Sequence, residues 1–123
     1  MTDTSGNGVL QMGVRDETRS ALVALAQGRR LIVDWSVSNC CGAAIGDLRL
    51  TWHAANEPPD PHLVPISGVG PVEGWCRPEL VDVLDGAGAR LEVRGIGPFR
   101  RATIVLERPE LWLDFVAEAP ARS

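Results

Sequence analysis

The chain has 123 residues, of which 45% are hydrophobic, and its formal net charge is −4. A chain of this size and apolar content buries one core and forms one domain, which excludes a disordered protein and a multidomain protein. Its basic residues form no cluster longer than pairs such as Arg29-Arg30 and Arg100-Arg101, and its six aromatic residues do not alternate with them, so we expect no nucleic-acid partner.

The sequence also bears on the compartment of the protein. It contains no apolar run of about 18 residues and opens with no charged-then-apolar leader, so we expect a cytoplasmic protein without a membrane partner. Residues 1–13 are small and polar, and we expect a flexible N-terminal leader there. A single domain is expected over residues 14–118, followed by a C-terminal tail over residues 119–123.

Hydrophobic periodicity predicts the first elements. An amphipathic helix is expected over Asp16–Gln27, with Gly28 as its stop. A hydrophobic period of two predicts strands with one face in the core over 31–37 and 47–53, which we expect to pair as neighbours. Three prolines then predict an exposed loop over residues 56–61.

The rest of the chain alternates short strands with turns. Short strands are expected over 63–66 and 69–75, and a short helix that begins at Pro78. Two alternating segments between residues 90 and 107, separated by glycine and proline, predict a hairpin. These elements indicate an α+β fold with a dominant, mostly antiparallel sheet, one N-terminal helix and one short helix, after which a terminal helix could follow.

Two adjacent cysteines, Cys40 and Cys41, are the strongest functional signal. They lie in the segment Ser38-Asn39-Cys40-Cys41-Gly42, between the first two expected strands. Successive side chains of a regular strand point to opposite faces, so two neighbouring thiols that face one ligand need an irregular backbone. Asn39 and Gly42 tolerate the positive φ of such a turn. In a reducing compartment these cysteines favour free thiols, metal ligands or catalytic groups over structural bridges.

Several chemistries are open to this pair. Consecutive Cα atoms lie about 3.8 Å apart, closer than the roughly 4.4–6.8 Å of relaxed disulfides, so a bridge between them would be strained and easily reduced. Thiolates also bind zinc, Cu(I) or iron in clusters, and such sites usually take four ligands. Cys76 could add a third ligand and His53 or His62 a fourth, or a second chain could supply its own Cys40 and Cys41.

Cys76 itself allows two interpretations. It lies where a short strand meets the helix expected from Pro78, and a helix N-terminus lowers the pKa of a thiol that faces it, so Cys76 could be reactive. Alternatively, it is a buried small apolar residue, a role that one of Cys40 and Cys41 could share.

The order of these elements resembles the HesB-like domain of A-type iron–sulfur carrier proteins. In that family a helix leads into a strand, a cysteine-bearing Gly-rich loop and a second strand, and then into a short strand and a small helix. The resemblance covers roughly residues 14 to 107. The matching segments are Asp16–Gln27, Leu31–Val37, Ser38–Gly42, Asp47–His53 and Val69–Leu84.

The chain departs from the carriers at its C-terminus. Residues 111–123 contain no cysteine, whereas the carriers end in a Cys-x-Cys or related motif that completes the cluster site. The adjacent Cys40 and Cys41 are similar to the arrangement of a divergent HesB-like branch. The resemblance implies a small, β-sandwich-like HesB-type fold and a cysteine-bearing loop that holds the cofactor.

We therefore predict a small cytoplasmic HesB-like protein that binds a metal ion, an iron–sulfur species or another thiophilic ligand through Cys40 and Cys41, with Cys76 as a further metal ligand. Its expected partners are a second copy of itself and an iron–sulfur or metal-handling protein. The alternatives are a non-catalytic interaction or structural domain that has lost the cluster site, and a thiol redox protein. No catalytic residue is assigned, and binding rather than catalysis is expected.

Overall fold

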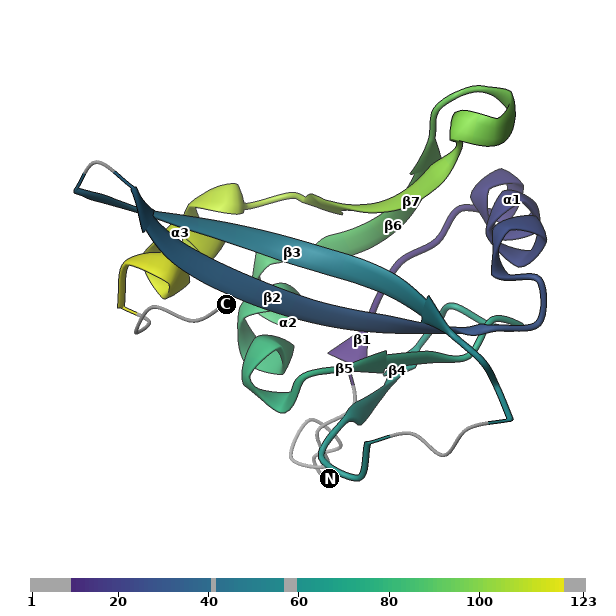
Figure 1. Ribbon diagram of the computed structural model, residues 1–123, viewed down its shortest axis with the longest axis horizontal. Coiled ribbons are helices and arrows are strands. Elements are labelled where there is room, and N and C mark those ends of the chain that lie inside the picture. The colour runs from purple at the N-terminus through teal and green to yellow at the C-terminus, as the bar shows by residue number, and fades with distance from the viewer. Residues whose placement is uncertain (1–9, 41, 57–59, 119–123) are drawn as a thin grey trace.

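The centre of the fold is a long antiparallel hairpin (Figure 1). A computed structural model of the chain describes residues 10–40, 42–56 and 60–118. In it, β2 (Arg30–Cys40) and β3 (Ala43–His53) pair residue by residue, from Arg30 opposite His53 to Cys40 opposite Ala43. This pairing confirms that the two alternating segments are strands and that they are neighbours.

Both strands extend further than the alternation predicts. The sequence favours an irregular connection over residues 38–42, whereas the ladder continues through Ser38 opposite Ile45 and Asn39 opposite Ala44. Each added rung pairs backbone N–H and C=O groups that a loop would leave to water, which explains why the strands continue. Gly42 has a φ of 83°, so the positive φ expected beside the cysteines occurs at this residue.

The hairpin forms one side of a five-stranded sheet of order β1-β4-β5-β2-β3. β5 (Gly74–Cys76) pairs with β2 in parallel, and β4 (Val64–Ser67) pairs with β5 antiparallel. β1 (Leu10–Gln11) completes the sheet in parallel with β4. The longest ladder is antiparallel as expected, but the sheet is mixed.

The first described residues belong to the core rather than to a leader. Leu10 and Met12 are buried, and the backbone N–H of Met12 donates to the carbonyl of Ser67 at 3.0 Å. The flexible leader expected over residues 1–13 is therefore wrong for residues 10–13, and residues 1–9 lie outside the described part of the chain. Leu10 and Met12 are two residues apart, which is the period of a strand. Two residues are too few to predict a strand among small and polar neighbours.

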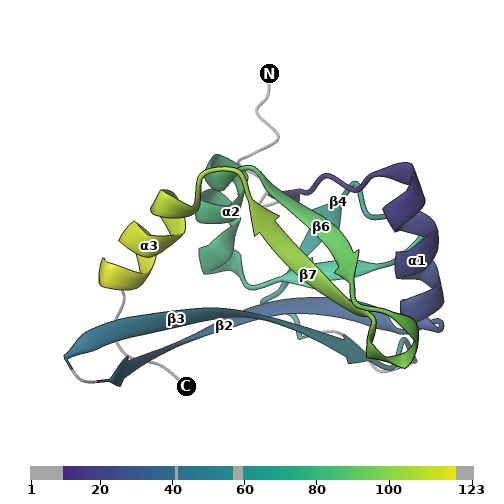
Figure 2. The ribbon, with the colours of Figure 1, turned by 90° about the horizontal axis from the view of Figure 1, so that it is seen from above.

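A second layer covers one face of the hairpin (Figure 2). It contains the antiparallel pair β6 and β7, as the glycine and proline between them predict, and three α-helices. The α+β class is confirmed, and the terminal helix α3 follows the two expected helices. The elements are α1 (Asp16–Ala26), α2 (Val81–Ala87) after a 3-10 turn (Pro78–Leu80), β6 (Ala89–Arg94), β7 (Arg101–Leu106) after a 3-10 turn (Gly97–Phe99), and α3 (Pro109–Glu118).

The core lies between the two layers. Leu31 and Val33 of β2 are fully buried, as are Leu22 of α1, Leu84 of α2 and, to 1% exposure, Leu91 of β6. The opposite phase of the hairpin faces away from this layer and is mostly polar, with exposed residues such as Arg49, Thr51 and His53 and with exposed Ile45 near its free end. Among the helices that the structure describes, none is long and apolar enough to cross a membrane.

Aromatic packing fixes α3 against the hairpin. The ring of Trp35 on β2 meets Phe115 edge-on at 4.8 Å between centroids and Trp112 edge-on at 6.3 Å. Trp112 and Phe115 stack on each other at 5.4 Å. Such pairs contribute about 0.5–1.5 kcal/mol each beyond their area burial. Gly46 of β3 makes the approach possible, because a Cβ at this position would overlap the side chain of buried Val116.

The close approach of α3 to β3 predicts the effect of a single methyl group. Gly46→Ala should lower the free energy of unfolding by about 1–3 kcal/mol, because the packed Val116 side chain must move to admit it. Chemical denaturation followed by circular dichroism measures this change.

The matched control is Gly86→Ala in α2, where an added Cβ meets Leu111 at an ordinary 3.6 Å. This variant should equal or exceed the wild-type stability, because alanine favours a helix over glycine by about 0.5–1 kcal/mol. Equal stability of both variants would contradict the packing of α3 on β3.

Candidate functional site

The free end of the β2–β3 hairpin carries the cysteine pair. Cys40 is the last residue of β2, and its backbone lies opposite Ala43, the first residue of β3. Cys41 lies outside the described residues, and Gly42, which follows it, is exposed. The β2–β3 ladder thus carries Cys40 to its last rung, at the opposite end from the Arg30–His53 rung.

Cys76 lies far from this end of the hairpin. In the parallel pairing of β5 with β2, Cys76 is opposite Val33, seven residues before Cys40 along β2. At about 3.3 Å per residue this separation is ~23 Å. The backbone of Cys76 is therefore far from that of Cys40 along the sheet.

The two histidines do not complete a site with Cys40 either. His53 ends β3 at the opposite end of the hairpin, where its Nε2 lies 3.0 Å from the hydroxyl of Thr51. His62 is exposed, and its backbone N–H donates to the carboxylate of Asp60 at 2.9 Å. Within the described ranges, no three His, Cys, Asp or Glu side chains are grouped as a metal site would require.

Cys76 is an interior thiol. Its side chain is fully buried, and its Sγ donates to the backbone carbonyl of Arg77 at 3.3 Å. Burial, together with the negative charges of Glu79 and Asp34, raises its pKa from 9.0 to about 12. Of the two interpretations of Cys76, the buried small apolar residue is confirmed, and the thiol activated by the helix start at Pro78 is wrong because burial and two carboxylates oppose ionisation.

A polar cluster surrounds Cys76 and joins three elements. The guanidinium of Arg77 lies 3.4 Å from the carboxylate of Asp34 on β2 and 3.5 Å from that of Asp60. The indole N–H of Trp35 donates to the carboxylate of Glu79 at 2.9 Å. These contacts hold the corner after β5 against the hairpin, and they account for the acidic side chains near Cys76 without a bound ligand.

An apolar surface lies beside the cysteine end of the hairpin. Ile45, two rungs from the end of the ladder, is 51% exposed, and Leu113 of α3 is 65% exposed. Together they border a shallow hollow of about 360 Å³. We call this surface the α3 patch. Its lining residues are Ile45, Gly46, Trp112, Leu113, Val116 and Ala117.

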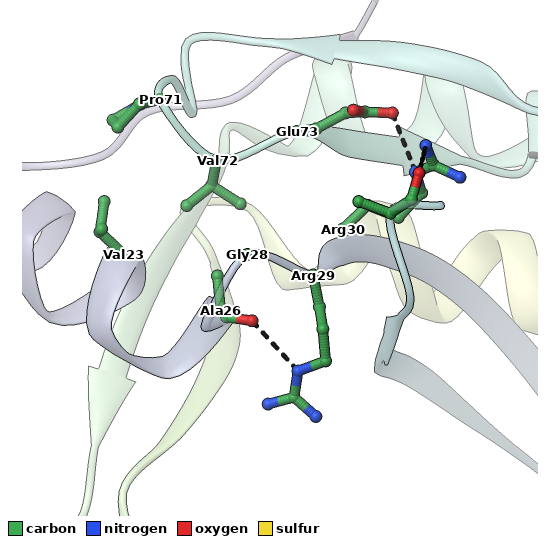
Figure 3. Close-up of a pocket in the computed structure, with 9 residues that line it drawn as sticks. Val23, Ala26, Gly28, Arg29, Arg30, Pro71, Val72 and Glu73 are labelled. Carbon is green, nitrogen blue, oxygen red and sulfur yellow. Dashed lines mark hydrogen bonds and ion pairs between the residues drawn. The ribbon is translucent and has the colours of Figure 1, made fainter. Parts of the chain in front are cut away.

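A smaller pocket of about 250 Å³ contains an ion pair between buried Arg30 and exposed Glu73 (Figure 3). Arg30 is only 8% exposed, its Nε lies 2.9 Å from the carboxylate of Glu73, and its Nη2 donates to the carbonyl of Ala55 at 2.9 Å. Figure 3 shows this pair on one side of the pocket and the apolar side chains of Val23 and Val72 on the other. Because Glu73 neutralises the charge of buried Arg30, we interpret this ion pair as structural and not as part of a ligand site. Nothing in the sequence distinguishes Arg30 from the other arginines.

No protein-family model and no curated protein matches the chain. The likeness to HesB-like domains therefore rests on the order of the elements and on the position of the cysteine pair.

The buried state of Cys76 predicts a pH dependence. Between pH 9 and about 12 the unfolded chain loses the Cys76 proton while the folded chain keeps it, so the stability that Cys76 contributes is complete below this range and falls within it. Cys76→Ala should cost about 1 kcal/mol near neutral pH, and this cost should shrink as the pH rises above 9. Denaturation of both proteins across this range measures the difference. A constant cost would show that the thiol is not buried as described.

Proposed function

We propose that two copies of this chain bind one soft metal ion or one iron–sulfur cluster between them, each through Cys40 and Cys41. The four thiolates would then form an all-sulfur site. Sulfur ligands select zinc, Cu(I) and iron–sulfur clusters, and four is the usual number of ligands in closed sites. The protein would act as a carrier or holder of this species rather than as an enzyme.

One observation carries the proposal, the position of Cys40 on the last rung of the β2–β3 ladder. A residue at the free end of a hairpin can approach the same residue of another chain without unfolding either one. Cys76 lies ~23 Å along the sheet from Cys40, at about 3.3 Å per residue, so one chain offers two sulfurs at this end. An ion that takes four ligands would therefore bind only two thiolates of one chain. A second chain related by twofold symmetry would supply the other two thiolates.

The α3 patch supports the presence of a second chain. Ile45 lies about 7 Å along β3 from the last rung, at 3.3–3.4 Å per residue, and Ile45 and Leu113 are both exposed apolar residues that border this hollow. Exposed apolar groups that lie together commonly mark an interaction site. Covering this surface would remove it from water at the same time as the four thiols meet.

The resemblance to HesB-like domains is part of the proposal. It would explain why a cysteine-bearing connection joins two neighbouring strands after an N-terminal helix. The absence of C-terminal cysteines in residues 111–123 favours the second candidate, an interaction domain that has lost the cluster site. The two candidates differ in one property, the stoichiometric binding of a thiophilic ion.

Zinc titration of the anaerobically purified protein tests the first candidate. We expect one Zn²⁺ for every two chains, release of protons as the thiols ionise, and a shift from monomer to dimer in light scattering. Cys40→Ala and Cys41→Ala should each abolish tight binding. The matched control is Cys76→Ala, which should bind as the wild type does because Cys76 lies far from the hairpin end.

The outcome decides among the predicted functions. Reduced protein that binds no Zn²⁺ and yields no iron–sulfur cluster on anaerobic reconstitution would favour the interaction domain. Reversible two-electron oxidation of Cys40 and Cys41 without metal would favour the thiol redox protein.

The dimer itself predicts a second set of variants. Replacing Ile45 or Leu113 with glutamine should weaken the zinc-dependent dimer by about tenfold or more, since an apolar contact at an interface core contributes more than 1 kcal/mol. Ile96→Gln is the matched control, because Ile96 is 86% exposed but lies on the β6–β7 hairpin. Sedimentation equilibrium with zinc measures the dimer, and equal weakening by all three variants would exclude the α3 patch as the interface.

A further inference from the structure

A groove with three arginines lies at the other end of the hairpin, where β3 and β7 meet the C-terminal end of α1. In Figure 2 the β6–β7 hairpin reaches over the end of β3 beside α1. The groove has a volume of about 550 Å³. We call it the arginine groove. The residues that define it here are Arg29, Leu48, Leu50, Trp52, Arg100 and Arg101.

Arg29 is held in place within the groove. Its Nε donates to the carbonyl of Ala26 at 3.1 Å and its Nη2 to the carbonyl of Leu25 at 3.0 Å, both at the end of α1. Its guanidinium carbon lies 5.9 Å from the ring centre of Trp52. These contacts fix the guanidinium before any ligand arrives, which lowers the entropic cost of binding.

Arg100 and Arg101 provide positive charge that no described carboxylate neutralises. In the part of the chain that the structure describes, neither forms an ion pair and no acidic residue lines the groove. Glu92 on β6 is occupied by Arg90 and Arg94, at 3.0 and 3.1 Å. A local positive charge is thus maintained in a chain whose formal net charge is −4.

The floor of the groove is apolar. It consists of three half-buried residues on the core-facing side of β3, Leu48, Leu50 and Trp52. The side chain of Trp52 provides a flat aromatic ring. Such a floor suits an apolar or aromatic group, while the arginines suit a phosphate or carboxylate, which guanidinium groups bind with paired hydrogen bonds. The volume falls within the usual 300–1,000 Å³ of small-ligand sites.

We propose that the arginine groove binds a small organic anion, with its phosphate or carboxylate at Arg100 and Arg101 and its flat apolar part on Trp52. This site is separate from the cysteine end of the hairpin and does not depend on the thiols. It gives the protein a second ligand, recognised by charge and by an aromatic surface.

Phenyl phosphate, inorganic phosphate and benzyl alcohol are the probes for this site. Titration followed by ¹H–¹⁵N NMR should show saturable 1:1 binding of phenyl phosphate with shifts at β3, β7 and the end of α1. Inorganic phosphate should bind about tenfold more weakly because it lacks the stacked ring. Benzyl alcohol, which has the ring without the charge, should not saturate.

Variants separate the two parts of the site. Arg100→Gln combined with Arg101→Gln should weaken phenyl phosphate by about tenfold or more, and Trp52→Leu should weaken phenyl phosphate but not inorganic phosphate. Arg49→Gln is the matched control, because Arg49 is an exposed arginine of the same strand whose side chain lies on the opposite phase. The proposal is overturned if phenyl phosphate does not bind at millimolar concentration, or if the double variant and the Arg49 variant lose equal affinity.

Discussion

Continuous backbone pairing between β2 and β3 is the constraint on which the rest of the structure depends. Because the ladder runs without interruption from Arg30–His53 to Cys40–Ala43, side chains alternate between the two faces along its length. One phase supplies the core and the other faces away from the covering layer. A slip of one residue would move every core side chain to the solvent face and would change which residue reaches the free end.

The same ladder separates two regions of different chemistry. At its free end lie Cys40 and the α3 patch, where α3 is fixed by the contacts of Trp35 with Trp112 and Phe115. At its other end lies the arginine groove, which combines the end of α1 with β3 and β7. One region is rich in sulfur and apolar surface, whereas the other is positively charged. Cys76 belongs to neither, because it is enclosed in the core between them.

Local patterns in the sequence predict most of the helices and strands, but they do not predict how these elements are arranged in space. Periodicity predicts α1, the paired strands and the β6–β7 hairpin, since each depends on residues close in sequence. Parallel pairing of β5 with β2 depends on contacts between distant segments, and the position of Cys76 opposite Val33 follows from that pairing alone. The pKa of Cys76 could not be predicted for the same reason, because its cause is burial. Arg29 and Arg100 both line the arginine groove. They are far apart in the sequence and belong to no common motif, so the sequence alone does not indicate that they lie together.

We propose that Cys40 and Cys41 of two chains together make a four-sulfur site. X-ray absorption at the zinc edge of the zinc-loaded protein tests it most directly, because the spectrum reports the type, number and distance of the ligands. We expect four sulfur ligands at about 2.3 Å and one zinc for every two chains. A first shell that contains two sulfurs completed by nitrogen or oxygen, with one zinc for each chain, would contradict it.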